Sequence, residues 1–180
     1  MKKQLSATAI ALLAVTVFVA QSPAKMKGEL SAPQARATLE DICGMAEELT
    51  TAADQLASIA TRQDESDRQL EQLNMLRDGI NVVGRELASL QAAENTLPEW
   101  QQSTISEALP ILRDLATMTD EAIANFNTNR VHLWTTDFPT QANKMYEDAK
   151  RFRNLVLGNL KLASVRAHEQ KIEASLSSNQ

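Results

Sequence analysis

The sequence is poor in the residues from which most catalytic and metal sites are built. Its 180 residues include one cysteine, two histidines and five glycines. A single cysteine excludes an internal disulfide and a c-type haem, which is attached through two cysteines. No Cys-x-x-Cys, His-Glu-x-x-His or Glu-x-x-His spacing occurs, and the few glycines form no phosphate-binding loop. We therefore expect no catalytic, cofactor-binding or metal-binding residues, and a protein that is not an enzyme.

A long hydrophobic run occurs only at the N-terminus, from residue 7 to residue 20. Lys2 and Lys3 precede it, and small residues follow it, which favours cleavage after Ala24. The run is shorter than the roughly 20 residues that span a bilayer. We expect a signal peptide at 1–24, export to the periplasm or the extracellular space, and no stable membrane insertion after cleavage. An uncleaved signal anchor is the alternative.

Acidic residues outnumber basic ones, and the chain carries a net charge of −5. Removal of the signal peptide would make this about −7, which argues against nucleic acid as a partner. Basic residues are concentrated in the C-terminal third, where they form either a helix beside acidic neighbours or a basic docking face. Such a face would consist of Lys144, Lys150, Arg151 and Arg153.

The lone thiol of Cys43 cannot cross-link an exported chain internally, so stability has to come from a packed core. About 156 residues remain after signal cleavage, which is enough for one domain of ordinary size. We interpret Cys43 as a small, semi-buried apolar residue, with an intermolecular disulfide as the alternative.

Apolar residues recur at alternating steps of three and four in four stretches, as in helices that bury one face. These seams begin at Leu39, Leu73, Ile105 and Ala142. Residues 155–162 could instead form a hairpin, but both flanks favour helix. The pattern predicts an all-α protein with coiled-coil-like seams.

The predicted helix boundaries follow from capping signals. The segments "SAPQ" and "TLPE" are capping boxes with a proline in the first turn, and "DFPT" has a similar arrangement. The second helix is expected to begin in "RQDESD", with Asp64 or Ser66 as its cap. The expected parts are a linker at 25–30, a bundle over 31–175 with helices at about 31–61, 65–93, 97–134 and 137–173, and a flexible tail at 176–180.

Short connections favour an up-down-up-down antiparallel four-helix bundle. Two alternatives stay open at this point. The first two helices could run on as one, because no breaker separates them, and Pro110 has to kink the third helix or mark its real beginning.

Aromatic residues make up 4% of the chain and gather between residues 126 and 152. The rings in "HLWTTDFPTQ", Trp134 and Phe138, could either plug the end of the bundle or anchor a partner. The candidate interaction residues are Trp134, Phe138, Trp100 and Arg130.

These features predict an exported, non-enzymatic helical bundle that acts through protein–protein contact or as part of the envelope structure. A homo-oligomer is compatible with them. One alternative is an extracytoplasmic, sensor-like bundle that binds a small ligand near Pro110 or at residues 130–138. Another is a b-type haem bundle that uses Met45 and His168.

Overall fold

Four long helices form the part of the chain that the structure describes, which is residues 30–130 and 132–177 of a computed structural model. These helices are α1 (Ala32–Ile59), α2 (Ser66–Ala92), α3 (Glu99–Asn129) and α4 (Phe138–Ser177). Short 3-10 turns occur in the links, at Gln63–Glu65, Glu94–Thr96 and Leu133–Thr135. The described residues contain no strand, so the all-α prediction is confirmed. The predicted signal peptide lies outside them.

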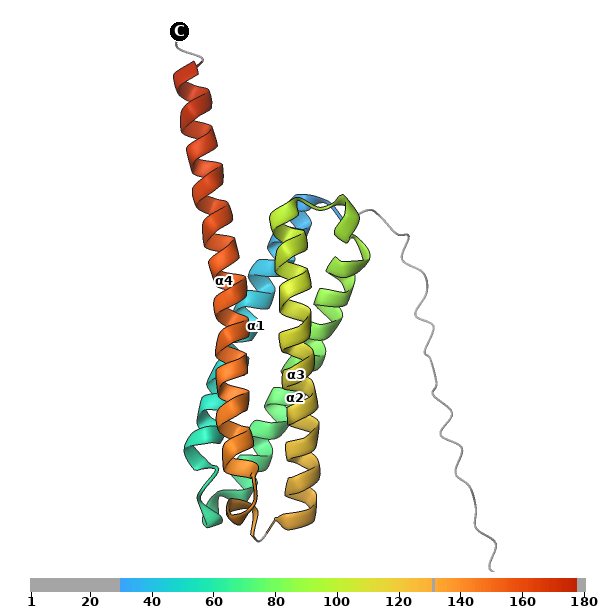
Figure 1. Cartoon of the computed structure of the whole chain (residues 1–180), viewed down its shortest axis with the longest axis vertical. Coiled ribbons are helices and arrows are strands. Elements are labelled where there is room, and N and C mark those ends of the chain that lie inside the picture. The colour runs from blue at the N-terminus through green and yellow to red at the C-terminus, as the bar shows by residue number, and fades with distance from the viewer. Residues whose placement is uncertain (1–29, 131, 178–180) are drawn as a thin grey trace, which may run out of the picture.

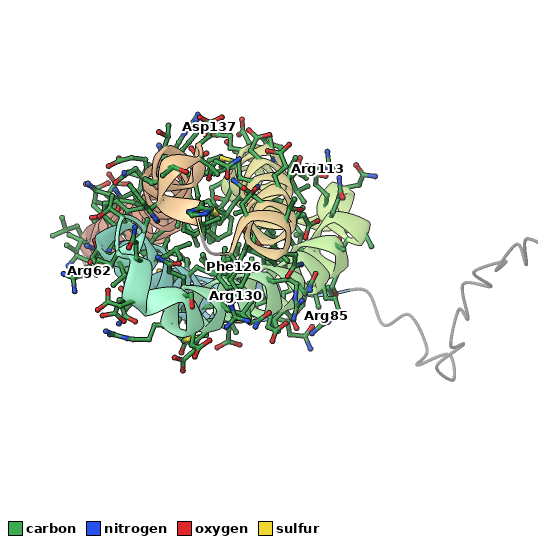
Figure 2. All side chains as sticks on the ribbon, turned by 90° about the horizontal axis from the view of Figure 1, so that it is seen from below. Arg62, Arg85, Arg113, Phe126, Arg130 and Asp137 are labelled. Atoms are coloured by element: carbon green, nitrogen blue, oxygen red, sulfur yellow. The ribbon has the colours of Figure 1, made fainter. Side chains whose placement is uncertain are left out.

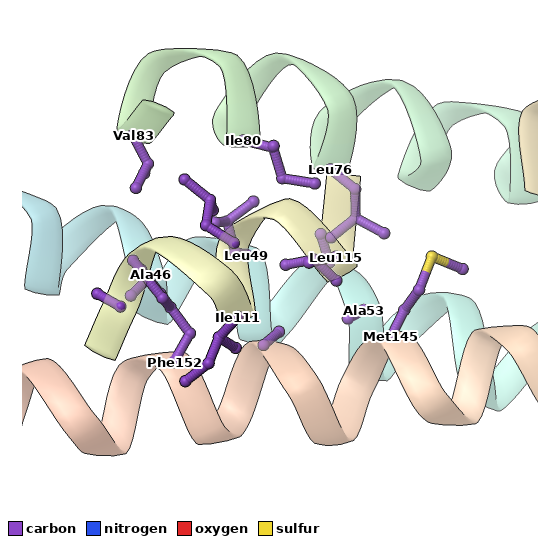
Figure 3. Packing of buried hydrophobic residues seen from close by; sticks show 14 of the residues in the cluster. Ala46, Leu49, Ala53, Leu76, Ile80, Val83, Ile111, Leu115, Met145 and Phe152 are labelled. Carbon is purple, nitrogen blue, oxygen red and sulfur yellow. The ribbon is translucent and has the colours of Figure 1, made fainter. Parts of the chain in front are cut away.

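The helices pack in a closed cycle around one core. Each helix contacts the next one along the chain, and α4 also contacts α1 (Figure 1). Figure 3 shows side chains from all four helices meeting in this core, including Leu49 of α1, Leu76 of α2, Leu115 of α3 and Phe152 of α4. The predicted seams supply these residues, and small ones such as Ala46 let neighbouring helices approach closely.

The link between α1 and α2 depends on a buried glutamine. Gln69 lies in α2, and its Nε2 donates to the carbonyl oxygens of Ile59 at 2.8 Å and Arg62 at 3.0 Å. Carbonyls at a helix end have no partner within the helix, so these bonds stabilise the turn. The two helices are therefore separate. The cap of α2 was predicted wrongly, because Glu65 occupies the N-cap position.

The two helix starts "SAPQ" and "TLPE" both contain proline, but only the first forms a capping box. In "SAPQ", the backbone N–H of Ser31 donates to Gln34 Oε1 at 2.9 Å, as a capping box requires. The box predicted for "TLPE" is wrong, because Thr96 belongs to a 3-10 turn and its hydroxyl donates to the Ala93 carbonyl at 2.8 Å. Pro98 is the N-cap instead.

Two residues expected to disturb helices are accommodated within them. Helix α3 runs through Pro110, and α4 runs through Gly158, so the hairpin alternative is wrong.

Helix α3 ends at Asn129, earlier than predicted, because a 3-10 turn follows and buries Leu133. Helix α4 reaches Ser177, which places part of the predicted tail in the helix.

Cys43 is buried in the core, as predicted, with 8% of its surface exposed. Burial raises the pKa of its thiol above 9.0, and Glu47 raises this pKa further. The native state thus holds the proton more tightly than the unfolded state. The thiol's contribution to stability is complete below pH 9 and is lost as the pH rises through the higher native pKa.

We expect an aromatic disulfide reagent at pH 8 to label the native Cys43 thiol at least about tenfold more slowly than the unfolded chain, since the thiolate is the nucleophile. Unfolding measured between pH 8 and 10.5 should show a steeper loss of stability than in a Cys43→Ala variant. Equal labelling rates in the native and unfolded chains would contradict this description of the site.

Candidate interaction surface

The C-terminal part of α4 extends beyond the other helices (Figure 1). Leu160 is the last buried residue of α4, although the helix continues to Ser177. Near the start of α1, Arg36 Nη2 donates to Ser164 Oγ at 2.7 Å. The first turns of α1 therefore lie beside residue 164, and the rest of α4 projects past them.

This projecting segment carries large apolar side chains that are exposed. They are Leu162, Val165, Ile172 and Leu176, with exposed fractions of 48%, 54%, 45% and 64%. Together they form what we call the α4 stripe. With Glu169 included, the spacing alternates between three and four residues, which is the spacing of a coiled-coil seam.

The α4 stripe faces away from the core of its own bundle. An α-helix turns by about 100° per residue, so each stripe residue lies about 120–160° around α4 from Leu160. Leu160 points into the core. The stripe is therefore not an extension of the core-facing row, and the four-helix packing leaves it uncovered.

A groove of about 730 Å³ lies where α4 leaves the bundle. Its walls include Arg36, Glu99, Trp100, Leu162 and Arg166, so α1, α3 and α4 all contribute. The Trp100 ring is half-buried. This groove is open to solvent, unlike the closed cavity expected of a small-ligand binder, and lies away from the predicted 130–138 location. An open depression of about 490 Å³ between α2 and α3, lined by Leu109 and Leu112, lies beside the other predicted location, Pro110.

The opposite end of the bundle carries the other candidate residues. Phe138 is fully buried, so its ring belongs to the core, which agrees with the interpretation of a plug at the end of the bundle and not with that of a contact residue. Trp134 is 40% exposed. The Arg130 guanidinium lies 5.6 Å from the centre of the Phe126 ring, and both residues are labelled in Figure 2. Arg130 also pairs with Asp67 of α2.

The four predicted residues therefore do not form one surface. Trp100 lies in the first turn of α3, while Arg130 and Trp134 follow its last turn. The 31 residues of α3 span about 46 Å. Any contact made by Trp134 is thus remote from the groove and from the α4 stripe.

Most of the predicted basic docking face has intramolecular partners. Lys144 Nζ lies 3.0 Å from Asp148 Oδ2. The Nζ atom of Lys150 lies 5.5 Å from the centre of the Tyr146 ring. Arg153 is half-buried. These contacts favour the interpretation of a basic helix beside its own acidic and aromatic neighbours.

The predicted haem pair is not brought together. Met45 is half-buried, whereas His168 is exposed on the projecting part of α4. Arg36 contacts Ser164, and Met45 lies nine residues further along α1, away from the part of α4 that carries His168, so the two side chains are at least about 12 Å apart. Within the described ranges, no three His, Cys, Asp or Glu residues are grouped to hold a metal ion. None of the helices in these ranges is long and apolar enough to cross a membrane.

The α4 stripe was not predicted, although the sequence contains a pattern that indicates it. Beyond Leu160, apolar residues still recur at steps of three and four, with Glu169 between them. This row starts at Leu162 and not at a residue of the core-facing row. This change of phase indicates a second apolar face on the same helix.

Comparisons of the chain with protein-family models, with curated proteins and with solved structures found no match.

Proposed function

We propose that this chain is an exported, non-enzymatic helical bundle that acts by binding protein through the projecting part of α4. The supporting observation is the α4 stripe, whose four large apolar side chains are 45–64% exposed. Such side chains are normal when scattered singly, but four of them on one helix face at coiled-coil spacing, interrupted only by Glu169, are typical of an interaction site.

The proposal includes the location and topology of the chain. Export is supported by the N-terminal sequence, and the up-down-up-down antiparallel arrangement by the short links between the helices. The contact between Arg36 of α1 and Ser164 of α4 agrees with that arrangement. Helices that alternate in direction leave the C-terminal part of α4 free to project past the start of α1.

The test uses the full-length gene product, exported by its own N-terminus and carrying a C-terminal affinity tag. We expect cross-linking in intact cells to recover at least one protein partner, which includes a second copy of the chain, and the recovered chain to have the mass of a product that begins at Lys25. An Ile172→Glu variant places a charge in the centre of the α4 stripe. It should reduce recovery at least about tenfold, because a buried unpaired charge is costly at an interface.

Ala174→Glu is the matched control, since it adds the same charge to the same segment about 160° away around the helix. Recovery should be nearly unchanged with this variant. A Trp134→Ala variant tests the opposite end of the bundle. Equal recovery with Ile172→Glu and with the unmodified chain would overturn the role of the α4 stripe.

A further inference from the structure

We propose that Val165, Ile172 and Leu176 of the α4 stripe are covered by the same segment of a second copy of this chain, so that two projecting segments pair as antiparallel helices. This inference rests on the proposed function, because it names the partner of the same surface. The spacing of the stripe, its charges and the length of helix beyond the bundle point to this occupant.

The spacing of the α4 stripe selects a helix as its partner. Leu162, Val165, Glu169, Ile172 and Leu176 occupy alternating a and d positions of a heptad repeat. Side chains at these positions insert between four residues of a facing helix. A second copy offers a helix with the same spacing and the same exposed length.

The charge of the segment is compatible with self-association. Residues 161–177 contain three basic and two acidic residues, whereas the whole chain has a net charge of −5. Two copies therefore repel each other less through this segment than through the rest of their acidic surfaces. Glu169, which lies between Val165 and Ile172 on the same helix face, is the only charged residue that interrupts the α4 stripe.

The position of Glu169 selects the antiparallel orientation. In a parallel pair, Glu169 would lie against Glu169 of the second copy, and Lys161 would lie beside its Arg166. Both contacts bring like charges together, which is unfavourable. In the antiparallel orientation, Glu169 can lie opposite Ile172, and its carboxylate can reach solvent at the edge of the seam.

One antiparallel register also pairs opposite charges. When Val165 lies opposite Leu176 of the second copy, Arg166 lies beside its Glu173, and the two-fold axis repeats this ion pair. If the second copy is shifted by one heptad towards the bundle of the first, Arg166 lies against Arg166 of the second copy. The charges therefore select the register in which the segments pair near their ends.

The length of α4 fits this register. Residue 177 then lies opposite residue 164 of the second copy, which is where Arg36 contacts α4. The paired part thus begins where the bundle ends, and the two bundles lie at opposite ends of the paired helices. The contact covers two heptads, less than the roughly 800 Å² per partner of stable interfaces, so we expect a weak dimer with a Kd of about 10–300 µM.

The test is sedimentation equilibrium of the purified exported chain from about 5 to 500 µM. We expect the average mass to rise from one chain towards two. Ile172→Glu should raise the Kd at least about tenfold, while Ala174→Glu should change it by less than about twofold. Circular dichroism of each variant checks that α4 keeps its helix content.

Charge exchange tests the register. Arg166→Glu and Glu173→Arg should each weaken the dimer about fivefold, and the double variant should restore it. A chain that stays monomeric to 500 µM, or a double variant weaker than both single variants, overturns the inference. If the chain is monomeric but the α4 stripe still recovers a different protein in cells, the proposed function stands without the dimer. Loss of both results removes both proposals.

Discussion

Replacement of Phe138 by alanine is expected to lower the free energy of unfolding by about 3–5 kcal/mol, the usual cost of deleting a buried phenyl ring. Phe138 is the first residue of α4, and its side chain is fully buried. The turn before it also buries Leu133, so this end of the core has little freedom to collapse into the space left by the ring. Urea denaturation, with the midpoint and slope fitted together, measures the change.

Trp134 is the matched control, because it is a ring of larger size only four residues away. It is 40% exposed, and its truncation should change the free energy of unfolding by no more than about 1–1.5 kcal/mol. Equal losses from Trp134→Ala and Phe138→Ala would mean that both rings support the core, and Trp134 would then cease to be a candidate contact residue.

The helices could be predicted because a helix is determined by the spacing of apolar residues within its own segment of the sequence. A seam such as Leu73, Leu76, Ile80 and Val83 specifies a helix whatever its neighbours are, and all four of these residues are buried. The ends of the helices were less predictable, since tertiary contacts compete with local capping. Gln69 donates a hydrogen bond to the carbonyl oxygen of Ile59, ten residues earlier, and no local sequence pattern predicts that bond.

The direction of each aromatic ring could not be predicted for a related reason. Phe138 and Trp134 are separated by the change from a 3-10 turn to an α-helix, and the two structures differ in residues per turn. A helical wheel drawn across this boundary therefore misplaces one of the rings. Within α4, where the geometry is uniform, the same reasoning could have identified the α4 stripe.

A proline lies inside α3, far from both ends of the helix. Pro110 has no N–H to donate to the carbonyl of Ser106, and its ring crowds that carbonyl. A Pro110→Ala variant is therefore expected to be more stable than the unmodified chain by about 1–3 kcal/mol. The gain is reduced because alanine gives the unfolded chain more conformational freedom, which offsets about 0.4–1 kcal/mol.

Since Pro110 is exposed, the substitution removes little packing, and the midpoint of urea denaturation should rise. Pro33→Ala provides the control, because Pro33 lies in the first turn of α1, where no intrahelical hydrogen bond is lost. That variant should show no gain. If Pro110→Ala fails to stabilise the chain while Pro33→Ala leaves it unchanged, the proline is matched to a local distortion of α3 that alanine cannot relieve.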